Sequence, residues 1–430
     1  MLARNRSLSR LLAASGLLAI LSSIGFAQTL DWEVFYPDAG SSETCGRLVR
    51  TDNSGNLLVS GVDETDTNDT LILAKYDANG VQQWLTTYDP TGDNFFEVED
   101  MAIDADNNLV VVGNSYGDTA NWVVTKIAPD GSTLWTKTEP DYTTASLAIS
   151  PTGHIYVVGS SLATATQDIV VRHIGPGGAT FWTKHIDGAG ATDDSGQNIA
   201  IDGDGNLLVA GYSIGTDDIQ RFMKLSPEGV KLWGSPLSIS QEDVHPVKII
   251  PAPSGGSYVA SNDSGVVEQL GIISHYDVDG ELVWRKYFNI SATGTAAIAD
   301  MCLDASGNIL VAGDGDSGSG SHVVLRKMDT SGTKIWQRNY DAVASYSLAC
   351  RVLVAPDNSI YIVGSVLDDG FKTLVLKYSS AGTLTWDYAY QGSEFYDEAM
   401  DATLSGNAVV GLSMSQVTPD REAMHLFQLR

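Results

Sequence analysis

The stretch MDTSGTKIWQRNYD at residues 328–341 combines the end of one strand, a tight turn and a second strand that carries Trp336. Close copies of this pattern recur at 76–89, 128–139, 175–186, 226–237, 276–288 and 378–390. An eighth tryptophan, in LDWEVFY at 30–36, lacks the preceding turn. Successive tryptophans in this series are 52, 51, 47, 51, 51, 52 and 50 residues apart. A period near 50 residues indicates a repeat architecture, in which a chain of 430 residues can fold as one domain.

Each unit contains three more short apolar runs before its tryptophan strand. In the unit that ends at Trp135 these are DMAID (100–104), NLVVVG (108–113) and WVVTKI (122–127). Runs rich in β-branched residues, separated by Gly, Asn and Asp, are typical of strands joined by turns. The turn before seven of the eight tryptophans ends in glycine, and it has the form D-x-x-G at 77–80, 277–280 and 329–332. This pattern suits a type I turn followed by a glycine at positive φ. Four antiparallel strands in every unit predict a blade of a β-propeller.

The two ends of the chain determine the number of blades. Seven units are complete, whereas the last, at 399–430, contains only three of the four strands. The segment 29–38, with Trp32, supplies the missing outer strand pattern. We therefore predict an all-β, eight-bladed propeller of four-stranded antiparallel blades. Pairing of the N-terminal strand in the last blade would close the ring and remove exposed sheet edges.

These units resemble a known bacterial repeat. The string IDADNNLVVVGNSYGDTANWVVTKIAPDGSTLW at 103–135 resembles the SBBP-type β-propeller repeat, and the D-x-x-G-x-x-x-W ending is also similar to the pyrroloquinoline-quinone (PQQ)-like repeat of eight-bladed propellers. The resemblance covers 29–430 and implies the architecture. Quinoprotein dehydrogenases carry a vicinal cysteine pair, and this chain departs from them because it has no adjacent cysteines.

The first residues have the pattern of a secretory signal peptide. Arg4, Arg6 and Arg10 precede an apolar run at 11–26, and Gly25 and Ala27 provide small residues before a cleavage site at Ala27/Gln28. The run of about 16 residues is shorter than the roughly 20 needed to span a bilayer. We expect export to the periplasm or the extracellular space, which leaves 28–430 as a single propeller domain.

The chain is strongly acidic, with 53 Asp and Glu against 25 Lys and Arg and a net charge of −28. Such a surface repels phosphate backbones and anionic lipids, so we expect the chain to bind no nucleic acid and not to insert into membranes. We also expect a monomer. Calcium stays open as an alternative because D-x-D-G occurs at 202–205 and 277–280. Apolar strand residues soon follow these strings, which favours Asx turns. We predict no other cofactor.

Three cysteines, Cys45, Cys302 and Cys350, leave at least one thiol outside any intramolecular disulfide. Pairing of Cys302 with Cys350 remains open, although buried thiols are the default. The repeated tryptophans are predicted to pack between blades. A recurring polar residue on the third strand is expected diagonally across from each tryptophan, where a cation–π or hydrogen-bond contact could form. These residues are Lys75, Lys126, His173, Lys224, His275, Lys327, Lys377 and Gln428.

The connections that enter each blade, and those between its second and third strands, are long and variable. In a four-stranded blade both sets lie on one side of the ring, which we call the long-loop face. Variable loops on a rigid scaffold commonly carry binding residues. Aromatic and acidic residues gather in the loops of three adjoining blades and indicate a peptide or sugar site. The alternative is that these aromatic side chains fold back over the ends of the blades. The candidate ligand-binding residues are Glu43, Phe95, Phe96, Glu97, Glu99, Trp122, Glu394, Phe395, Tyr396 and Asp397.

The sequence contains no HExxH, P-loop or CxxC motif, and we assign no catalytic, cofactor or metal residue. The hypothesis favoured by these patterns is an exported, non-catalytic scaffold that binds a protein or glycan on the long-loop face. The alternative is a polysaccharide lyase or hydrolase, or a PQQ-like enzyme, with its site at the mouth of the channel. The fold alone does not choose between them, because propellers host both classes.

Overall fold

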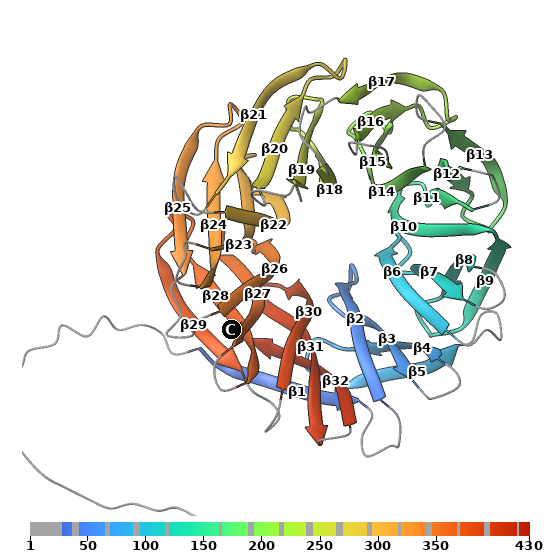
Figure 1. The fold of residues 1–430 in the computed structure, drawn as a ribbon. Helices are drawn as coiled ribbons and strands as arrows, with labels where there is room; N and C mark the ends of the chain where they lie inside the picture. The colour runs from blue at the N-terminus through green and yellow to red at the C-terminus, as the bar shows by residue number, and fades with distance from the viewer. Residues whose placement is uncertain are drawn as a thin grey trace, which may run out of the picture.

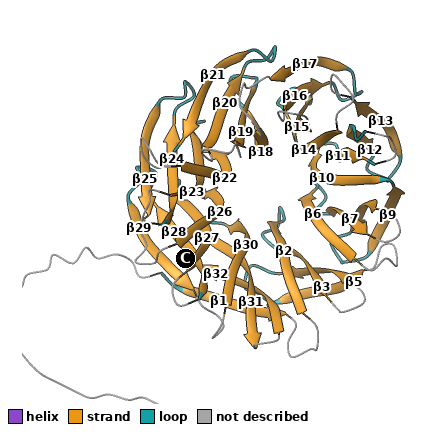
Figure 2. Cartoon of the chain, viewed as in Figure 1, coloured by secondary structure: helices purple, strands orange, loops and turns teal. Residues whose placement is uncertain are grey.

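The computed structural model describes residues 28–36, 43–64, 69–88, 95–116, 120–162, 166–187, 193–214, 219–237, 244–263, 270–289, 295–316, 320–340, 346–367, 370–390, 396–418 and 421–430. Across these ranges the regular elements are all β-strands (Figure 2). None of the described residues form a helix that could cross a bilayer. The predicted signal peptide at 1–27 lies outside the described residues.

The strands form antiparallel groups of four that are arranged around a common centre (Figure 1). Five sheets contain four strands each. A sixth contains twelve, because three successive groups are joined by the single parallel pairings Leu270↔Ala296 and Ser321↔Tyr346. In seven of the groups the strands follow chain order from the centre outward, so the first strand is innermost and the tryptophan strand outermost (Figure 1). In the eighth group β30, β31 and β32 follow the same order, and β1 from the start of the chain is outermost. The all-β propeller architecture predicted from the repeats is confirmed.

The first four groups comprise the strands β2 Glu43–Thr51, β3 Leu57–Glu64, β4 Asp69–Tyr76 and β5 Gln82–Tyr88; β6 Phe95–Ile103, β7 Leu109–Tyr116, β8 Ala120–Ile127 and β9 Thr133–Pro140; β10 Tyr142–Ile149, β11 Ile155–Ser161, β12 Ile169–Ile174 and β13 Thr180–Ile186; β14 Asp193–Ile201, β15 Leu207–Ile214, β16 Ile219–Leu225 and β17 Lys231–Leu237.

The remaining groups comprise β18 Val244–Pro251, β19 Ser257–Asp263, β20 Leu270–Tyr276 and β21 Leu282–Phe288; β22 Thr295–Leu303, β23 Ile309–Asp316, β24 Ser321–Met328 and β25 Lys334–Tyr340; β26 Tyr346–Val354, β27 Ile360–Leu367, β28 Phe371–Tyr378 and β29 Leu384–Tyr390; and β30 Tyr396–Ser405, β31 Ala408–Thr418, β32 Arg421–Leu429 and β1 Leu30–Tyr36. In this last group β1 pairs antiparallel with β32, from Leu30↔Leu429 to Tyr36↔Met424.

The tryptophans connect neighbouring groups. The indole Nε1 of Trp84 donates to the carbonyl of Pro129 at 2.9 Å, in the turn of the next group, and Trp32 donates in the same way to Ala78 at 3.1 Å. Four further tryptophans repeat the bond at 2.8–3.1 Å, namely Trp135, Trp182, Trp233 and Trp284. Each indole also lies against the glycine of that turn. The predicted packing of tryptophan between units is therefore present.

Two separate constraints favour glycine in these turns: a positive φ, and the close approach of an indole ring. Gly131 has φ +89°, and a Cβ there would lie 2.8 Å from Cδ2 of Trp84. Gly55 has φ +82° with no atom within 4 Å of the added carbon. We expect Gly131→Ala to lower the free energy of unfolding by about 3 kcal/mol and Gly55→Ala by about 1 kcal/mol, because only the first also displaces a packed ring. Urea denaturation measures both, and equal losses would contradict the role given to the indole.

The polar residue on the third strand lies directly opposite the tryptophan and not diagonally, as in the pair Lys75↔Trp84. This corrects the predicted placement, and the lysine has a different partner. Lys75 Nζ pairs with Asp52 at 3.0 Å, and Lys126 pairs with Asp104 at 2.8 Å. Equivalent pairs join Lys224 to Asp202 and Lys327 to Asp304. Where the unit has no such aspartate, Lys377 faces the ring of Tyr361 at 5.0 Å and that of Trp386 at 5.9 Å, so the predicted cation–π contact with the tryptophan is present at this position.

Candidate functional site on the inner strands

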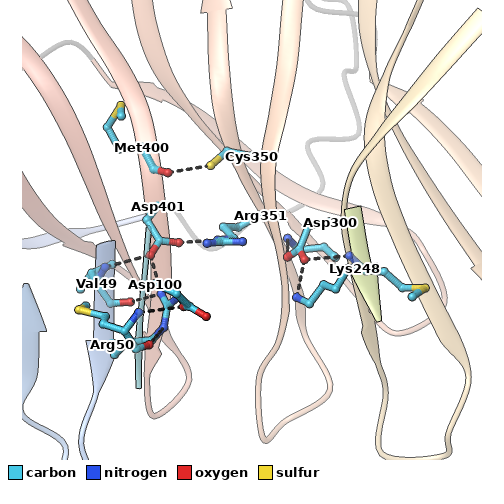
Figure 3. A network of polar contacts seen from close by, with 12 residues as sticks. Val49, Arg50, Asp100, Lys248, Asp300, Cys350, Arg351, Met400 and Asp401 are labelled. Carbon is cyan, nitrogen blue, oxygen red and sulfur yellow. Dashed lines mark hydrogen bonds and ion pairs between the residues drawn. The ribbon is translucent and has the colours of Figure 1, made fainter. Parts of the chain in front are cut away.

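The innermost strands share a local irregularity. Each of β2, β6, β10, β14, β18, β22, β26 and β30 shifts register against its neighbour at the same place, as between Val98 and Asp100 in β6. Such a β-bulge inserts one extra residue and re-aims the side chains beside it. The residue that follows the bulge is charged in five of these strands: Asp100, Lys248, Asp300, Arg351 and Asp401. With Arg50 of β2 they form a set that we call the inner-strand charge belt (Figure 3).

Asp401 is the most buried member of the belt, with no exposed surface. Its carboxylate accepts hydrogen bonds from the backbone N–H of Val49 at 2.9 Å and from Arg50 at 2.6 Å, and it also pairs with Arg351 (Figure 3). Burial alone would raise the pKa of Asp401, but the two guanidinium groups and the N–H donor outweigh it and hold that pKa below its usual value. The carboxylate therefore stays ionised at neutral pH.

In every second group, the residue that follows the bulge accepts a hydrogen bond from a backbone N–H of the next inner strand. Asp300 accepts from the N–H of Val352 at 3.0 Å and pairs with Lys248 at 2.5 Å. Asp100 accepts from the N–H of Leu147 at 3.1 Å. Asn198, which carries no charge, accepts from the N–H of Ile249 at 3.1 Å. Together with Asp401, these side chains connect β6 to β10, β14 to β18, β22 to β26 and β30 to β2.

The belt is suited to holding strands together and poorly suited to acid–base catalysis. A general acid or base needs a pKa near the working pH and access to a substrate proton. Asp300 and Asp401 are instead buried, paired with cations and committed to backbone N–H groups. Sequence analysis missed this role. The available signal was an Asp or Asn that begins the inner-strand pattern at intervals of 98, 102 and 101 residues, from residue 100 to residue 401.

A second polar cluster lies in the β6–β9 group, where β6 enters from the long-loop face. Glu97 is exposed and lies opposite Asn114, whose amide donates to Glu99 at 2.8 Å. Burial, with the nearby charge of Glu97, raises the pKa of Glu99 to about 7. Tyr116, at the end of β7, is 39% exposed, and burial and the same carboxylates raise its pKa. The structure thus adds Asn114 and Tyr116 to the predicted residues Glu97 and Glu99.

Glu99 gives the protein a pH-dependent stability. Because the pKa of Glu99 is about 7 in the folded chain, against an ordinary value of 4.5 for a glutamate, the native state binds the proton more tightly than the unfolded chain. Stability therefore falls as pH rises through that window. We expect Glu99→Gln to be more stable than the wild type by about 2 kcal/mol at pH 8, after allowance for solvent screening, and to match it at pH 4. Denaturant titrations at both pH values test this, with exposed Glu97→Gln as the control for a change of surface charge. A constant difference between Glu99→Gln and the wild type would contradict it.

Two predicted aromatic residues are core residues and not surface contacts. Phe96 packs with Leu71 and Leu73 of the preceding group and is 5% exposed. Trp122 is 3% exposed and lies under the guanidinium of Arg172 at 4.2 Å, on the side of its group that faces β10–β13. Their burial corrects the expectation of exposed aromatics at these positions. Each fills an inter-group layer, which removes more apolar area from water than an exposed loop position would.

The other predicted residues fall in different places. Tyr396 packs edge-on against Phe371 at 5.3 Å and its hydroxyl donates to Glu398. Asp397 is fully buried and accepts from Ser415. Glu43 and Phe95 begin β2 and β6, although only their backbone is described. Glu394 and Phe395 lie outside the described residues.

The acidic turns and one acidic cluster contain the oxygen atoms that a cation could bind. Asp202 accepts from the backbone N–H groups of Asp204 and Asn206 at 3.0 and 2.8 Å, as an Asx turn requires, and pairs with Lys224. Elsewhere, carboxylate oxygens of Asp168, Asp187 and Asp194 lie within 4.8 Å of one another. Exposed acidic groups commonly gather in this way without an ion, so we assign no metal to them.

Comparisons with known proteins agree with the architecture. The fold is shared with the solved structure of the Dos1 propeller, at 8% identity and a TM-score of 0.60 over 94% of this chain and 95% of that chain. It is shared with Sqt1 from Chaetomium thermophilum, at 10% identity and a TM-score of 0.58 over 94% of this chain and 99% of that chain. It is also shared with the quinohemoprotein alcohol dehydrogenase ADHIIG from Pseudomonas putida HK5, at 11% identity and a TM-score of 0.55 over 94% of this chain and 76% of that chain. No curated protein sequence matches the chain. These identities establish the β-propeller fold alone. Residues 182–218 match the SBBP β-propeller repeat, so the predicted resemblance is confirmed.

The likeness to a quinohemoprotein does not extend to its cysteine chemistry. Cys45, Cys302 and Cys350 lie in β2, β22 and β26, and none forms a disulfide. Cys350 donates to the carbonyl of Met400 at 3.0 Å, and burial raises its pKa to about 12 (Figure 3). A pairing of Cys302 with Cys350 is therefore not what the structure contains. No residues matching the vicinal pair of quinoprotein dehydrogenases are present, and we derive no chemistry through PQQ.

Proposed function

We propose that the chain is an exported, eight-bladed propeller that acts as a non-catalytic scaffold and binds a protein or glycan on its long-loop face. The blades would be the seven four-strand groups from β2–β5 to β26–β29 and the group of β30–β32 with β1. Pairing of β1 with β32 and the packing of Trp32 against Gly80 support closure of the ring. So does the apolar layer in which Val410 and Leu426 pack with Val49 and Ile72.

The observation that carries the binding proposal is the cluster of Glu97, Glu99 and Tyr116. It places an exposed carboxylate and a half-exposed tyrosine on one rigid sheet end. Amphipathic tyrosines beside carboxylates are typical of sites that contact a partner through both apolar and polar groups. The proposed function is non-catalytic. The inner-strand charge belt supports this part of the proposal, because Asp300 and Asp401 already bind cationic side chains and backbone N–H groups of neighbouring strands.

The experiment compares residues 28–430 with the variant Glu97→Gln/Tyr116→Ala on a glycan array and in affinity capture from the exporting cells, followed by quantitative binding of each ligand obtained. We expect the double variant to bind at least 10-fold more weakly, with Gln83→Ala on the outer strand β5 as a control that leaves affinity unchanged. Equal affinity in the double variant would refute the site. Cleavage of a polysaccharide by the purified chain would favour the lyase or hydrolase alternative.

A further inference from the structure

The outer strands on one part of the ring differ in charge from the rest of the chain. Five of them, β9, β13, β17, β21 and β25, carry seven Lys or Arg residues and a single acid, Glu139. We call these five strands the basic rim. The outer strands β29, β1 and β5 carry no Lys or Arg, and they include Asp387, Asp31 and Glu33. In a chain with a net charge of −28, this separation is a specific feature of the rim.

The basic rim also exposes apolar side chains at a repeated position. The residue before each tryptophan is large, apolar and 50–57% exposed in all five strands: Leu134, Phe181, Leu232, Val283 and Ile335. A register shift explains the exposure. In β13, for example, His173 pairs with Trp182 and Ile174 with Thr180, so Phe181 has no Cα partner on β12. Its ring contacts the rings of His173 and His154, with centroids 4.8 and 5.5 Å away, and still leaves 57% of the residue exposed. On β5 and β29 the same position is polar, with Gln83 and Thr385.

Lysines accompany these apolar side chains, either directly before them, as in β17 and β25, or three positions after them, as in β13 and β21. Lys184, Lys231, Lys286 and Lys334 are exposed. Arg338 is less available, because it donates to the carbonyl of Gly382 and lies over Trp336. Acidic residues such as Glu228 and Asp279 occupy the turns beyond the strand ends, so the positive charge is confined to the strands themselves.

Protection against edge pairing explains only part of this pattern. Lysines and bulges on edge strands commonly prevent association between sheets. That purpose applies equally to β5 and β29, which have no lysine, and it does not account for half-exposed leucine, phenylalanine, valine and isoleucine on the lysine-bearing strands. Exposed apolar side chains that recur together with lysines on five successive outer strands suit an interaction surface that extends along the rim.

We propose that the basic rim is a docking surface for an acidic peptide segment that carries apolar side chains. Its glutamates or aspartates would pair with the exposed lysines, and its apolar side chains would cover Leu134, Phe181, Leu232, Val283 or Ile335. Opposite charge on the partner would speed association and select against basic partners. The surface is distinct from the Glu97 and Tyr116 cluster of the proposed function, so each can fail without the other.

The test uses the chain 28–430 and three labelled dodecapeptides: one with six glutamates and three leucines, one with the leucines replaced by serine, and one with the glutamates replaced by lysine. Fluorescence anisotropy at low salt should give at least 10-fold tighter binding for the first peptide than for either other peptide. The variant Lys184→Gln/Lys231→Gln/Lys286→Gln/Lys334→Gln should lose at least 10-fold.

A matched control keeps the net charge of that variant but places the change elsewhere. The substitutions Gln82→Glu/Gln83→Glu/Thr87→Glu/Thr385→Glu add four negative charges at exposed positions on β5 and β29. This control should bind the acidic peptide within twofold of the wild type. Equal losses in both variants, or equal binding of all three peptides, would overturn the proposal. Tighter binding of polygalacturonate, or lysine-dependent self-association in sedimentation, would overturn the peptide as occupant in favour of an anionic glycan or a second copy.

Discussion

Replacing Asp401 by asparagine is expected to lower the free energy of unfolding at pH 7 by about 3 kcal/mol. The carboxylate has no exposed surface and neutralises both Arg50 and Arg351. Removing one partner of a buried ion pair leaves the others uncompensated. We take the low end of the usual cost because the two arginine side chains are 28% and 27% exposed and water screens part of the loss. Urea or guanidinium denaturation of the purified chain measures the difference.

The equivalent residue Asn198 provides the control for charge. It accepts the N–H of Ile249 without any ion pair, so Asn198→Ala should cost only about 1 kcal/mol for one hydrogen bond. Asparagine at 401 can keep the bond to Val49, whereas Asp401→Ala loses it as well and should be the least stable of the three. Similar losses for Asp401→Asn and Asn198→Ala would show that the charge contributes nothing.

The pH dependence of the same variant has a defined sign. The pKa of Asp401 is lowered on folding, so its contribution is present above the unfolded pKa and is lost as pH falls through the lower folded value. The difference between wild type and Asp401→Asn should therefore be constant from pH 5 to 8 and shrink below about pH 4. A difference that grows on acidification would contradict the assignment of the ion pairs.

The sequence was sufficient for the repeat architecture because each unit repeats its own local signals. The D-x-x-G turn, the tryptophan that follows it and the short apolar strands are all set by residues within one period. The contacts of each tryptophan with the next turn follow from the same repetition, as with Trp84 and Gly131. A local pattern that recurs in register can be predicted without knowing the contacts between units.

The candidate site was harder to predict because it depends on contacts between distant residues. Asp401 and Val49 are 352 positions apart, and the residues around one of them do not indicate that the other is its partner. Likewise, Phe96 and Glu97 are adjacent in a loop-like acidic stretch, yet strand alternation buries the first and exposes the second. Sequence patterns located the acidic strand end but could not assign its side chains to core or surface.

Removal of β1 should be the most damaging change to the whole ring. In a chain that begins at residue 37, Trp32, Val34, Phe35 and Tyr36 no longer cover β32, where Met424 and Leu426 are each 2% exposed. Four half-buried side chains contribute roughly 5 kcal/mol, which is comparable to the whole stability of many domains. We expect the shortened chain either to remain unfolded or to melt at least 10 °C below residues 28–430 in calorimetry.

The loss should be reversible by the missing strand itself. A synthetic peptide of residues 28–36 can restore the pairing from Leu30↔Leu429 to Tyr36↔Met424, and binding to the native state alone raises stability with peptide concentration. The same peptide with Trp32→Ala should restore much less, because it lacks the indole that donates to Ala78 and lies on Gly80. Unchanged melting of the shortened chain, or equal rescue by both peptides, would contradict the proposed closure of the ring by β1.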